Sequence, residues 1–214
     1  MNTKEKDLCL PSMEYESALW QDGSTLVAGL DEAGRGAWAG PVYAAAVILP
    51  NDVRVKQILH GVNDSKKLSA KQRQRWKGCI QSASIAWAVA SASAQEVDEM
   101  GIVPASCTAM TRALDQLHYR PTYLLIDYVK LPDCNLPQTS LPKGDSISLS
   151  IAAASILAKT ARDEYMILLD ESYPQYGFAR HKGYGTALHR TALLDNGVCP
   201  LHRLSFAPMK FMGH

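Results

Sequence analysis

The sequence lacks the features of disulfide-rich, zinc-binding and membrane proteins. It has only five cysteines, an odd number, and no two are near neighbours in sequence, which fits neither a disulfide framework nor a zinc site. The longest unbroken apolar run covers the eight residues 42–49, and a helix of that length cannot cross a bilayer. Residues 1–24 contain no apolar segment of the kind found in signal peptides. We therefore expect a cytoplasmic protein with reduced thiols and no membrane partner.

A strong net charge of one sign is also absent. The chain has 22 Lys and Arg residues against 21 Asp and Glu, a net charge of +1. A uniformly basic surface is thus excluded, and any nucleic-acid binding has to come from a local patch. With 47% hydrophobic and 20% charged residues, the composition is globular and excludes disorder, collagen and coiled coil. For 214 residues we expect a single domain, 1–214, with a polar N-terminal arm at 1–23.

Apolar runs and helix signals alternate along the chain. Strands are predicted at 26–30, 42–49, 85–92 and 122–126, where short apolar runs end at turn signals. Helices are predicted at 69–82, 104–117, 146–171 and 183–196, with Ser69 as an N-cap and Gly197 as a C-terminal stop. The segment 131–142, with three prolines, is predicted as a loop. This order predicts an α/β domain with a mixed sheet.

Two of the predicted strands end in carboxylates. Asp31 and Glu32 close the first strand, and Asp127 closes the fourth. A buried, unpaired carboxylate is costly, and sites of α/β proteins tend to form at strand ends. Carboxylates without a cysteine or histidine set favour the hard cations Mg²⁺ and Mn²⁺. Two such ions, about 3.5–4 Å apart, are a common device for hydrolysing phosphodiesters.

A fourth carboxylate would complete such a site, and Asp145 and Asp163 are the two candidates. They are eighteen residues apart, which is about 27 Å along an unbroken helix, so both cannot serve one pair of metal ions. Asp145 lies at the predicted helix start, where it can reach the end of the sheet. Asp163 follows Lys159 by four residues, and an ion pair along the helix is the better interpretation.

A glycine-rich turn and two basic clusters complete the candidate site. Gly34, Arg35 and Gly36 follow the acidic pair, and they allow close approach of backbone amides to a hydroxyl or phosphate. Residues 54–77 hold eight basic side chains against Asp64 alone, including Lys66 and Lys67 before a helix, a placement that favours phosphate contact. Tyr184 lies between two glycines beside a second basic cluster at 180–182, which favours stacking on a sugar or base.

Together these segments resemble bacterial ribonuclease HII, in family order from about residue 26 to 208. The motifs that carry the resemblance are GLDEAGRG at 29–36, GPV at 40–42, DSKKL at 64–68, LID at 125–127, KGD at 143–145, AAASILAK at 152–159, RD at 162–163, KGYGT at 182–186 and HRLSF at 202–206. The resemblance implies a ribonuclease H-like fold, with a five-stranded mixed sheet flanked by helices and a C-terminal helical segment. The part from about 178 to 214 would contact substrate.

The resemblance also implies residue roles. By it, the metal-binding and catalytic carboxylates are Asp31, Glu32, Asp127 and Asp145. The Gly34–Arg35–Gly36 turn would read the ribose 2′-hydroxyl, Tyr184 would stack on the next deoxyribose, and Lys66 and Lys67 would contact the backbone. Two departures from the family pattern lie at the site. Ala37 stands where proline is frequent and Tyr128 where glycine is common, which puts the turn and the close backbone approach there in question.

The activity implied is endonucleolytic cleavage of RNA in RNA–DNA hybrids and on the 5′ side of single ribonucleotides in DNA, with Mn²⁺ or Mg²⁺. We expect a monomer. The tail at 206–214 either docks on a replication clamp or covers the core.

Three rival functions share part of this pattern. Ribonuclease HIII has the same core, although we expect no extra N-terminal domain from the roughly 25 residues before the first strand. A four-carboxylate exonuclease would lack the Gly34–Arg35–Gly36 turn beside its first acidic residues. A hybrid-binding protein without catalysis would not need the complete set of four carboxylates.

Overall fold

The computed structural model describes residues 10–211, and five strands form one mixed sheet within that range. The strands are β1 (Val27–Ala33), β2 (Val42–Ile48), β3 (Ala86–Ala92), β4 (Tyr123–Asp127) and β5 (Gln138–Leu141), in the spatial order β3-β2-β1-β4-β5. The pairs β1–β2 and β2–β3 are antiparallel, whereas β1–β4 and β4–β5 are parallel. The five-stranded mixed sheet expected from the family resemblance is confirmed.

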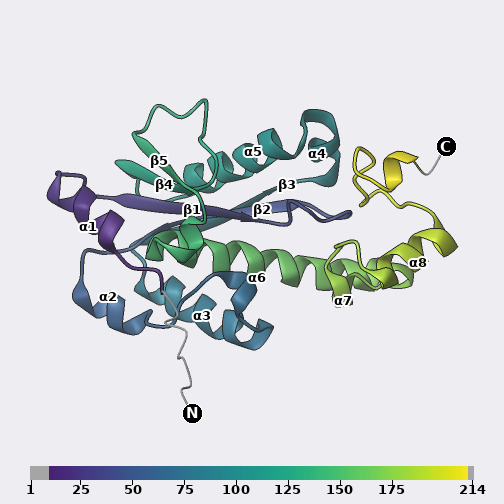
Figure 1. The fold of residues 1–214 in the computed structure, drawn as a ribbon, viewed down its shortest axis with the longest axis horizontal. Coiled ribbons are helices and arrows are strands. Elements are labelled where there is room, and N and C mark those ends of the chain that lie inside the picture. Colours follow the sequence, from purple (N-terminus) through teal and green to yellow (C-terminus); the bar gives the residue numbers. More distant parts are fainter. Residues whose placement is uncertain (1–9, 212–214) are drawn as a thin grey trace, which may run out of the picture.

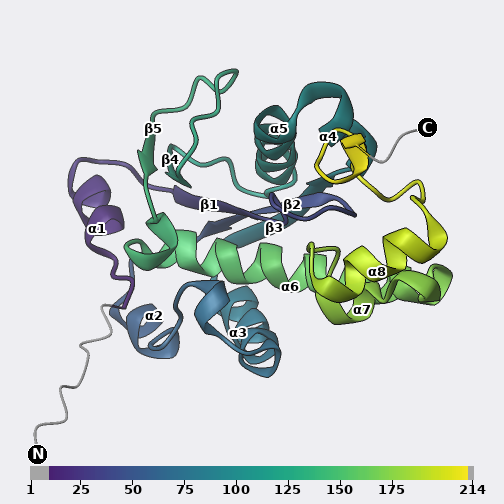
Figure 2. The same cartoon turned by 45° about the vertical axis from the view of Figure 1, so that its right-hand side comes forward.

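Helices cover both faces of this sheet (Figures 1 and 2). One face carries α4 (Ala94–Met100) and α5 (Ile102–Asp115). The other carries α6 (Leu149–Ser172), with α2 (Val53–Ile58) and α3 (Ala70–Ala83) beyond it. Neighbouring residues of β2 point to opposite faces, so that Ala44 packs in the core under α5 and Ala45 in the core under α6. The sheet is therefore buried on both sides.

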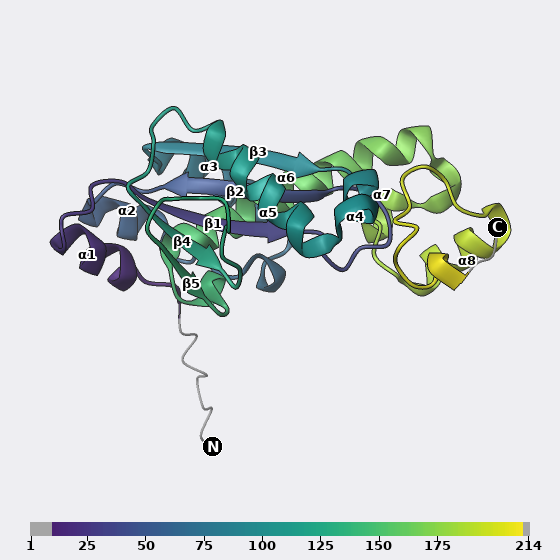
Figure 3. The same ribbon diagram turned by 90° about the horizontal axis from the view of Figure 1, so that it is seen from above.

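A C-terminal group of short elements lies beyond one end of the sheet (Figure 3). It comprises η3 (Pro174–Tyr176), α7 (Phe178–His181), α8 (Ala187–Asn196) and η4 (Met209–Phe211). A separate small core, which includes Phe178 and Leu193, joins α7 and α8 to the end of α6. The loop between β1 and β2 reaches this group, because Trp38 N donates to Gly183 O at 2.8 Å. The predicted C-terminal helical segment is thus present, although α8 starts at Ala187 and not at Gly183.

The remaining elements correct several sequence-based predictions. Residues 14–21 of the expected polar arm form helix α1 (Glu14–Gln21), while residues 1–9 lie outside the described range. Glu16 of this helix is fully buried, and its Oε1 accepts hydrogen bonds from Ser148 and Ser150 at the start of α6. The arm predicted as polar therefore includes a helix that packs against the fold, because groups at a helix N-terminus donate to one oxygen of Glu16.

Two further boundaries differ from the predictions. The supposed loop 131–142 contains β5, whose short sequence Gln138–Leu141 gives little apolar signal. The helix expected at 146–171 is divided into a 3-10 turn η2 (Gly144–Ser146) and α6, which starts after the N-cap Ser148. Helices α2 and α4, both short, were not predicted from the sequence. No helix in residues 10–211 is long and apolar enough to cross a membrane.

Candidate active site

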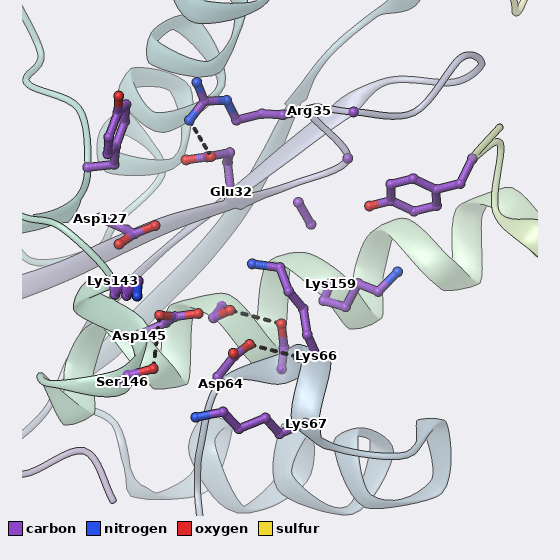
Figure 4. Close-up of a pocket in the computed structure, with 17 residues that line it drawn as sticks. Glu32, Arg35, Asp64, Lys66, Lys67, Asp127, Lys143, Asp145, Ser146 and Lys159 are labelled. Atoms are coloured by element: carbon purple, nitrogen blue, oxygen red, sulfur yellow. Dashed lines mark hydrogen bonds and ion pairs between the residues drawn. The ribbon is translucent and has the colours of Figure 1, made fainter. Parts of the chain in front are cut away.

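A cavity of about 860 Å³ opens where β1 and β4 end beside η2 and the start of α6 (Figure 4). Parallel pairing of β1 with β4 aligns Leu30 with Ile126, so the acidic residues that follow them meet at one edge. All but one of the site residues predicted from the sequence line this cavity: Glu32, Gly34, Arg35, Gly36, Lys66, Lys67, Asp127, Asp145 and Tyr184. The exception is Asp31, which is buried with 4% of its surface exposed.

The position of the first two carboxylates differs from the sequence prediction. Strand β1 continues to Ala33, so Asp31 and Glu32 lie within the strand instead of after it. Asp31 pairs with Ala45 of β2, and its Oδ1 accepts a hydrogen bond from the backbone N–H of Glu32 at 2.7 Å. Adjacent strand residues point to opposite faces, so the side chains of Asp31 and Glu32 do not extend in the same direction.

Burial raises the pKa of each of these carboxylates. Burial raises the pKa of Asp31 well above its usual range, and the charges of Glu32 and Asp127 add to this effect. Burial also raises the pKa of Glu32, although Arg35, 3.2 Å away, opposes the shift. The pKa of Asp127 is raised by burial, against a hydrogen bond from Gly144 N at 2.7 Å. These groups therefore form a cluster of buried carboxylates whose charged forms are disfavoured.

Asp145 and Asp64 form the lower wall of the cavity. Asp145 lies in η2, and burial together with the charge of Asp64 raises its pKa. Asp64 was treated in the sequence only as a charge opposing the basic cluster. Its carboxylate accepts a hydrogen bond from Lys66 N at 2.9 Å and caps the 3-10 turn η1 (Ser65–Lys67). The DSKK sequence, an N-cap before two lysines, was the signal that could have identified Asp64 as a cavity residue.

Lysine side chains supply positive charge in the cavity. Lys66 extends toward the carboxylates in Figure 4. Burial lowers its pKa, but the charges of Asp145, Asp64, Asp31 and Asp127 outweigh burial, and the net shift is upward. Lys67, Lys143 and Lys159 also line the cavity. The cavity thus combines acidic residues with a lysine rim suited to a phosphate backbone.

The donor set fits a hard divalent cation. Glu32 Oε2 is buried without a hydrogen-bond partner among the described residues, and such an orphaned oxygen is costly unless a cation or water satisfies it. Carboxylate oxygens are the ligands preferred by Mg²⁺ and Mn²⁺. Within residues 10–211, no group of three or more acidic, histidine or cysteine side chains lies close enough together to hold a metal ion. The ligand chemistry and the orphaned Glu32 oxygen fit a cation, although no metal-holding group is assembled among the described residues.

The turn after β1 presents its backbone to the cavity. Gly34 has a φ of +97°, a conformation that side-chain-bearing residues rarely adopt, and it lies directly against the Arg162 side chain. Gly36 is exposed, and no atom lies near the position that a Cβ would take. Ala37 N donates to Gly34 O at 3.2 Å, a bond that proline could not make. The turn is therefore closed in spite of the departure at Ala37.

Tyr184 lines the same cavity and is half-buried. Its ring is close to two cations, with Lys159 Nζ 5.2 Å and the Arg162 guanidinium 5.3 Å from the ring centroid. Two buried histidines hold its backbone: Tyr184 N donates to His181 O at 2.9 Å, and Tyr184 O accepts from His189 Nδ1 at 3.1 Å. The ring of Tyr184 therefore lines the cavity while it packs against Lys159 and Arg162.

Two buried arginines shape the site and were not identified as functional in the sequence. Arg162 is fully buried and donates to the carbonyl oxygens of Ala39, Pro41 and Lys182 at 2.9–3.1 Å. Arg203 is also fully buried and donates to Arg35 O at 2.9 Å and Gly40 O at 3.0 Å. Neither forms an ion pair with a carboxylate of the described residues. Their forked donors hold the turn after β1 in place.

Part of the basic cluster is used within the protein. Arg73 pairs with Asp163 at 3.1 Å, and Lys77 pairs with Glu164 at 2.8 Å. Lys159 pairs with Asp163 at 2.7 Å, which confirms the predicted helical ion pair. Asp163 therefore packs α3 against α6, away from the cavity lining. Lys66 and Lys67 are the residues of the predicted cluster that reach the cavity.

The sheet order, the two helix layers and the acidic residues on β1 and β4 define a protein of the ribonuclease H-like α/β class. A family model described as ribonuclease HII matches residues 28–209. The chain belongs to the ribonuclease HII family, which confirms the resemblance found in its motifs.

Two relatives show the extent of the similarity. The ribonuclease HII of Anaeromyxobacter sp. (strain Fw109-5) is 50% identical over 198 residues, which cover 92% of this chain and 62% of that protein. The chain thus spans less than two thirds of that relative's length. The ribonuclease HII of Bacillus anthracis (strain CDC 684 / NRRL 3495) is 50% identical over 209 residues, 98% of this chain and 79% of that protein.

Solved structures support the fold. The PCNA:RNase HII complex from Archaeoglobus fulgidus contains a chain that matches with a TM-score of 0.71 at 25% identity, over 85% of this chain and 95% of that one. Bst-RNase HIII in complex with Mn²⁺ matches with a TM-score of 0.67 at 24% identity, over 90% of this chain and 70% of that one. The predicted ribonuclease H-like fold is confirmed.

Proposed function

We propose that the protein is a metal-dependent endoribonuclease. It hydrolyses the RNA strand of RNA–DNA hybrids and cuts DNA on the 5′ side of single embedded ribonucleotides. The observation that carries this proposal is the group of Asp31, Glu32, Asp127 and Asp145, whose pKa values are all raised by burial, at a cavity rimmed with lysines. Membership of the ribonuclease HII family supports the same reaction class.

The acidic residues favour catalysis over binding alone. A protein that only bound a hybrid would be weakened by carboxylates placed beside the phosphates, because like charges repel. These carboxylates cost folding free energy where they are, since desolvation opposes their charged forms. Retaining them at the floor of a nucleic-acid cavity is consistent with a cation that screens them. This argues against a hybrid-binding protein without catalysis.

Asp31, Glu32, Asp127 and Asp145 would hold the cations. When bound there, divalent cations supply activation of the attacking water and charge stabilisation for the leaving 3′-oxygen. The ribonuclease HIII structure that resembles this chain is described in complex with Mn²⁺, and we expect Mn²⁺ or Mg²⁺ here. The chain's own contribution is to position the phosphate between Lys66 and the carboxylates. The products would carry 3′-hydroxyl and 5′-phosphate ends.

Selection of RNA rests on the turn after β1 and on Tyr184. The 2′-hydroxyl is what distinguishes a ribonucleotide from DNA. The exposed Gly36 leaves room for a sugar to approach the backbone groups of Gly34 and Arg35. Tyr184 would stack on the following sugar. Lys66 and Lys67 would contact the phosphate backbone.

We also expect residues 1–214 to act as one domain and as a monomer, with 178–214 contacting substrate. A replication clamp is a candidate partner, since the Archaeoglobus fulgidus ribonuclease HII is described in a complex with PCNA. In the C-terminal tail, Met209 is buried and Phe206 packs on the core, whereas Phe211 is 78% exposed. Phe206 and Met209 therefore pack on the protein while Phe211 is left exposed, and residues 212–214 lie outside the described range.

One assay separates the candidate functions. The protein is incubated with Mn²⁺ and a DNA duplex that contains one ribonucleotide, and the products are sized on a denaturing gel. An internal nick on the 5′ side of the ribonucleotide is expected. Shortening from the ends would instead indicate a four-carboxylate exonuclease, and a complex without cleavage would indicate a binding protein. A uniform RNA–DNA hybrid in parallel measures the general ribonuclease H activity.

A further inference from the structure

Tyr128 occupies an unfavourable backbone conformation directly after the site carboxylate Asp127. Its φ is +62°, in the left-handed region, which costs a residue with a side chain roughly 1–2 kcal/mol. The backbone on both sides is held in place, because Tyr128 N donates to Leu141 O at 3.2 Å and Val129 N donates to Asp127 O at 2.7 Å. Glycine would adopt this conformation without strain. The tyrosine side chain therefore needs a separate explanation.

Packing does not provide that explanation. Tyr128 is 65% exposed and lines the cavity instead of entering a core. Its hydroxyl forms no hydrogen bond with the described residues, and its only close aromatic contact there is the Arg35 guanidinium, 5.6 Å from the ring centroid. Such an exposed cation–π pair contributes about 0.5–1 kcal/mol, which is less than the backbone strain costs. The fold itself gains little from this side chain.

The contact with Arg35 places the ring within the recognition turn. Arg35 contacts both the Tyr128 ring and Glu32. Its Nη1 lies 3.2 Å from Glu32 Oε1 (Figure 4). The carbonyl oxygen of Arg35 accepts a hydrogen bond from the buried Arg203. One face of the cavity therefore consists of the turn, the guanidinium and the exposed ring of Tyr128, and Tyr184 lines the same cavity from a different element.

We propose that Tyr128 is a second aromatic substrate contact, which packs against a sugar of the bound duplex while it holds Arg35 in the orientation that faces the backbone. A sugar is the expected partner because the bases of a duplex are stacked on one another and present their edges at the surface. Aromatic rings are sequence-tolerant platforms for nucleotides, and Arg35 adds positive charge beside the same phosphate backbone. This inference rests on the proposed function, because it assumes that the cavity takes nucleic acid.

The test separates binding from folding with Tyr128→Gly. Glycine removes the left-handed strain but adds freedom to the unfolded chain, so the melting temperature should be unchanged or slightly higher. Affinity for an RNA–DNA hybrid, measured by fluorescence anisotropy without divalent metal, should fall about fivefold or more, the lower end of aromatic stacking on nucleotides. Tyr128→Phe, which keeps the ring, should bind within about twofold of wild type.

A matched control is Tyr119→Ala, because Tyr119 is 55% exposed and lies away from the cavity lining. This variant should bind the hybrid as wild type does.

The Arg35→Ala background tests whether the Tyr128 ring contacts the nucleic acid directly. In that background, Tyr128→Gly should weaken binding further. Wild-type affinity in Tyr128→Gly would overturn the proposal, and so would the absence of any further loss in the Arg35→Ala background. If wild type binds but does not cleave with Mn²⁺, the proposed function fails while this contact is still measured.

Discussion

The side chain of Arg162 lies directly against the backbone of Gly34, so that a methyl group at Gly34 would overlap the guanidinium. The same guanidinium bonds to Lys182 O and lies 5.3 Å from the Tyr184 ring. One buried residue of α6 therefore touches both elements proposed to read the substrate, the turn after β1 and the loop of Tyr184. Its conformation fixes the spacing between them.

Substitution by alanine should lower the stability at Gly34 and the cleavage activity at Gly36. Gly34→Ala puts a side chain at a φ of +97° and into Arg162. The backbone strain alone should lower the melting temperature by roughly 2–8 °C. Gly36→Ala meets no neighbouring atom, so its melting temperature should stay within about 1–2 °C of wild type, whereas cleavage should fall if substrate approaches this backbone closely. Differential scanning fluorimetry and initial cleavage rates measure the two effects. Full activity of Gly36→Ala would show that substrate does not approach there.

Variants of Asp145 and Asp163 provide a second comparison between a site residue and a structural residue. Asp145→Asn should lose most cleavage with little loss of stability, because burial and Asp64 already disfavour its charged form. Asp163→Asn removes the negative charge and one of the two carboxylate oxygens that accept from Arg73 and Lys159. It should lower the free energy of unfolding by roughly 1–3 kcal/mol while the folded protein retains activity. Chemical denaturation measures the stability of each variant, and cleavage rates measure its activity. If Asp163→Asn is well folded but inactive while Asp145→Asn is active, the roles assigned to the two aspartates are reversed.

Tyr184 should matter most at an RNA–DNA junction. A ring stacked on the sugar after the ribonucleotide would be crowded by a 2′-hydroxyl there, which favours DNA at that step. Tyr184→Ala should lose about 1–3 kcal/mol of transition-state stabilisation on a single embedded ribonucleotide, and less on a uniform hybrid. Tyr184→Phe should retain much of the activity, since the ring is kept. Initial rates on both substrates at one salt and Mn²⁺ concentration test this. Equal losses on the two substrates would assign Tyr184 a structural role.

A buried histidine cluster predicts loss of stability in acid. His189 stacks on His181 with ring centroids 4.4 Å apart, and its Nε2 lies 3.1 Å from His202 Nε2. Burial, together with the charges that His181 and His202 would carry, lowers the pKa of His189 to about 4. The pKa of an unfolded histidine is about 6.5. The neutral cluster therefore stabilises the fold fully above about pH 6.5, and this contribution is lost as pH falls toward 4.

Urea unfolding at several pH values between 7.5 and 4 measures this effect. In His189→Gln the free energy of unfolding should depend less steeply on pH than in wild type, because glutamine cannot be protonated. His118→Gln, at a histidine outside the cluster, is the matched control and should keep the wild-type slope. Parallel slopes for wild type and His189→Gln would mean that other groups cause the acid sensitivity.

The residues that line the site were easier to predict from the sequence than the buried residues that hold them in place. Acidic residues after apolar runs and a glycine pair are local signals, and they located Asp31, Asp127 and Gly34. Arg162 gave no such signal, because its partners are carbonyls of residues 39 and 41, more than a hundred residues away. Glu16 was placed in a polar arm for the same reason, since Ser148 and Ser150 donate to its Oε1 only in the folded protein.

Strand assignments failed where residues carry little apolar signal. Strand β5, QTSL, is short and polar at the edge of the sheet, and only pairing with β4 defines it. Strand β1 continues through Asp31 and Glu32 because the neighbouring strand β2 supplies pairing partners there, whatever the side chains are. The resemblance to ribonuclease HII supplied the fifth strand that periodicity could not.

The central claim is that the carboxylates at the ends of β1 and β4 hold divalent cations for cleavage of RNA. The most direct measurement is the initial rate of internal cleavage of an RNA–DNA hybrid across a Mn²⁺ titration, with wild type and the amide variants Asp31→Asn, Glu32→Gln and Asp127→Asn. Wild type should be inactive in EDTA and should saturate with Mn²⁺. Each variant should lose at least about a hundredfold in rate, because a neutral amide replaces an anionic metal ligand, while hybrid binding is retained. Cleavage by wild type in EDTA, or wild-type rates in any of the three variants, would contradict the account.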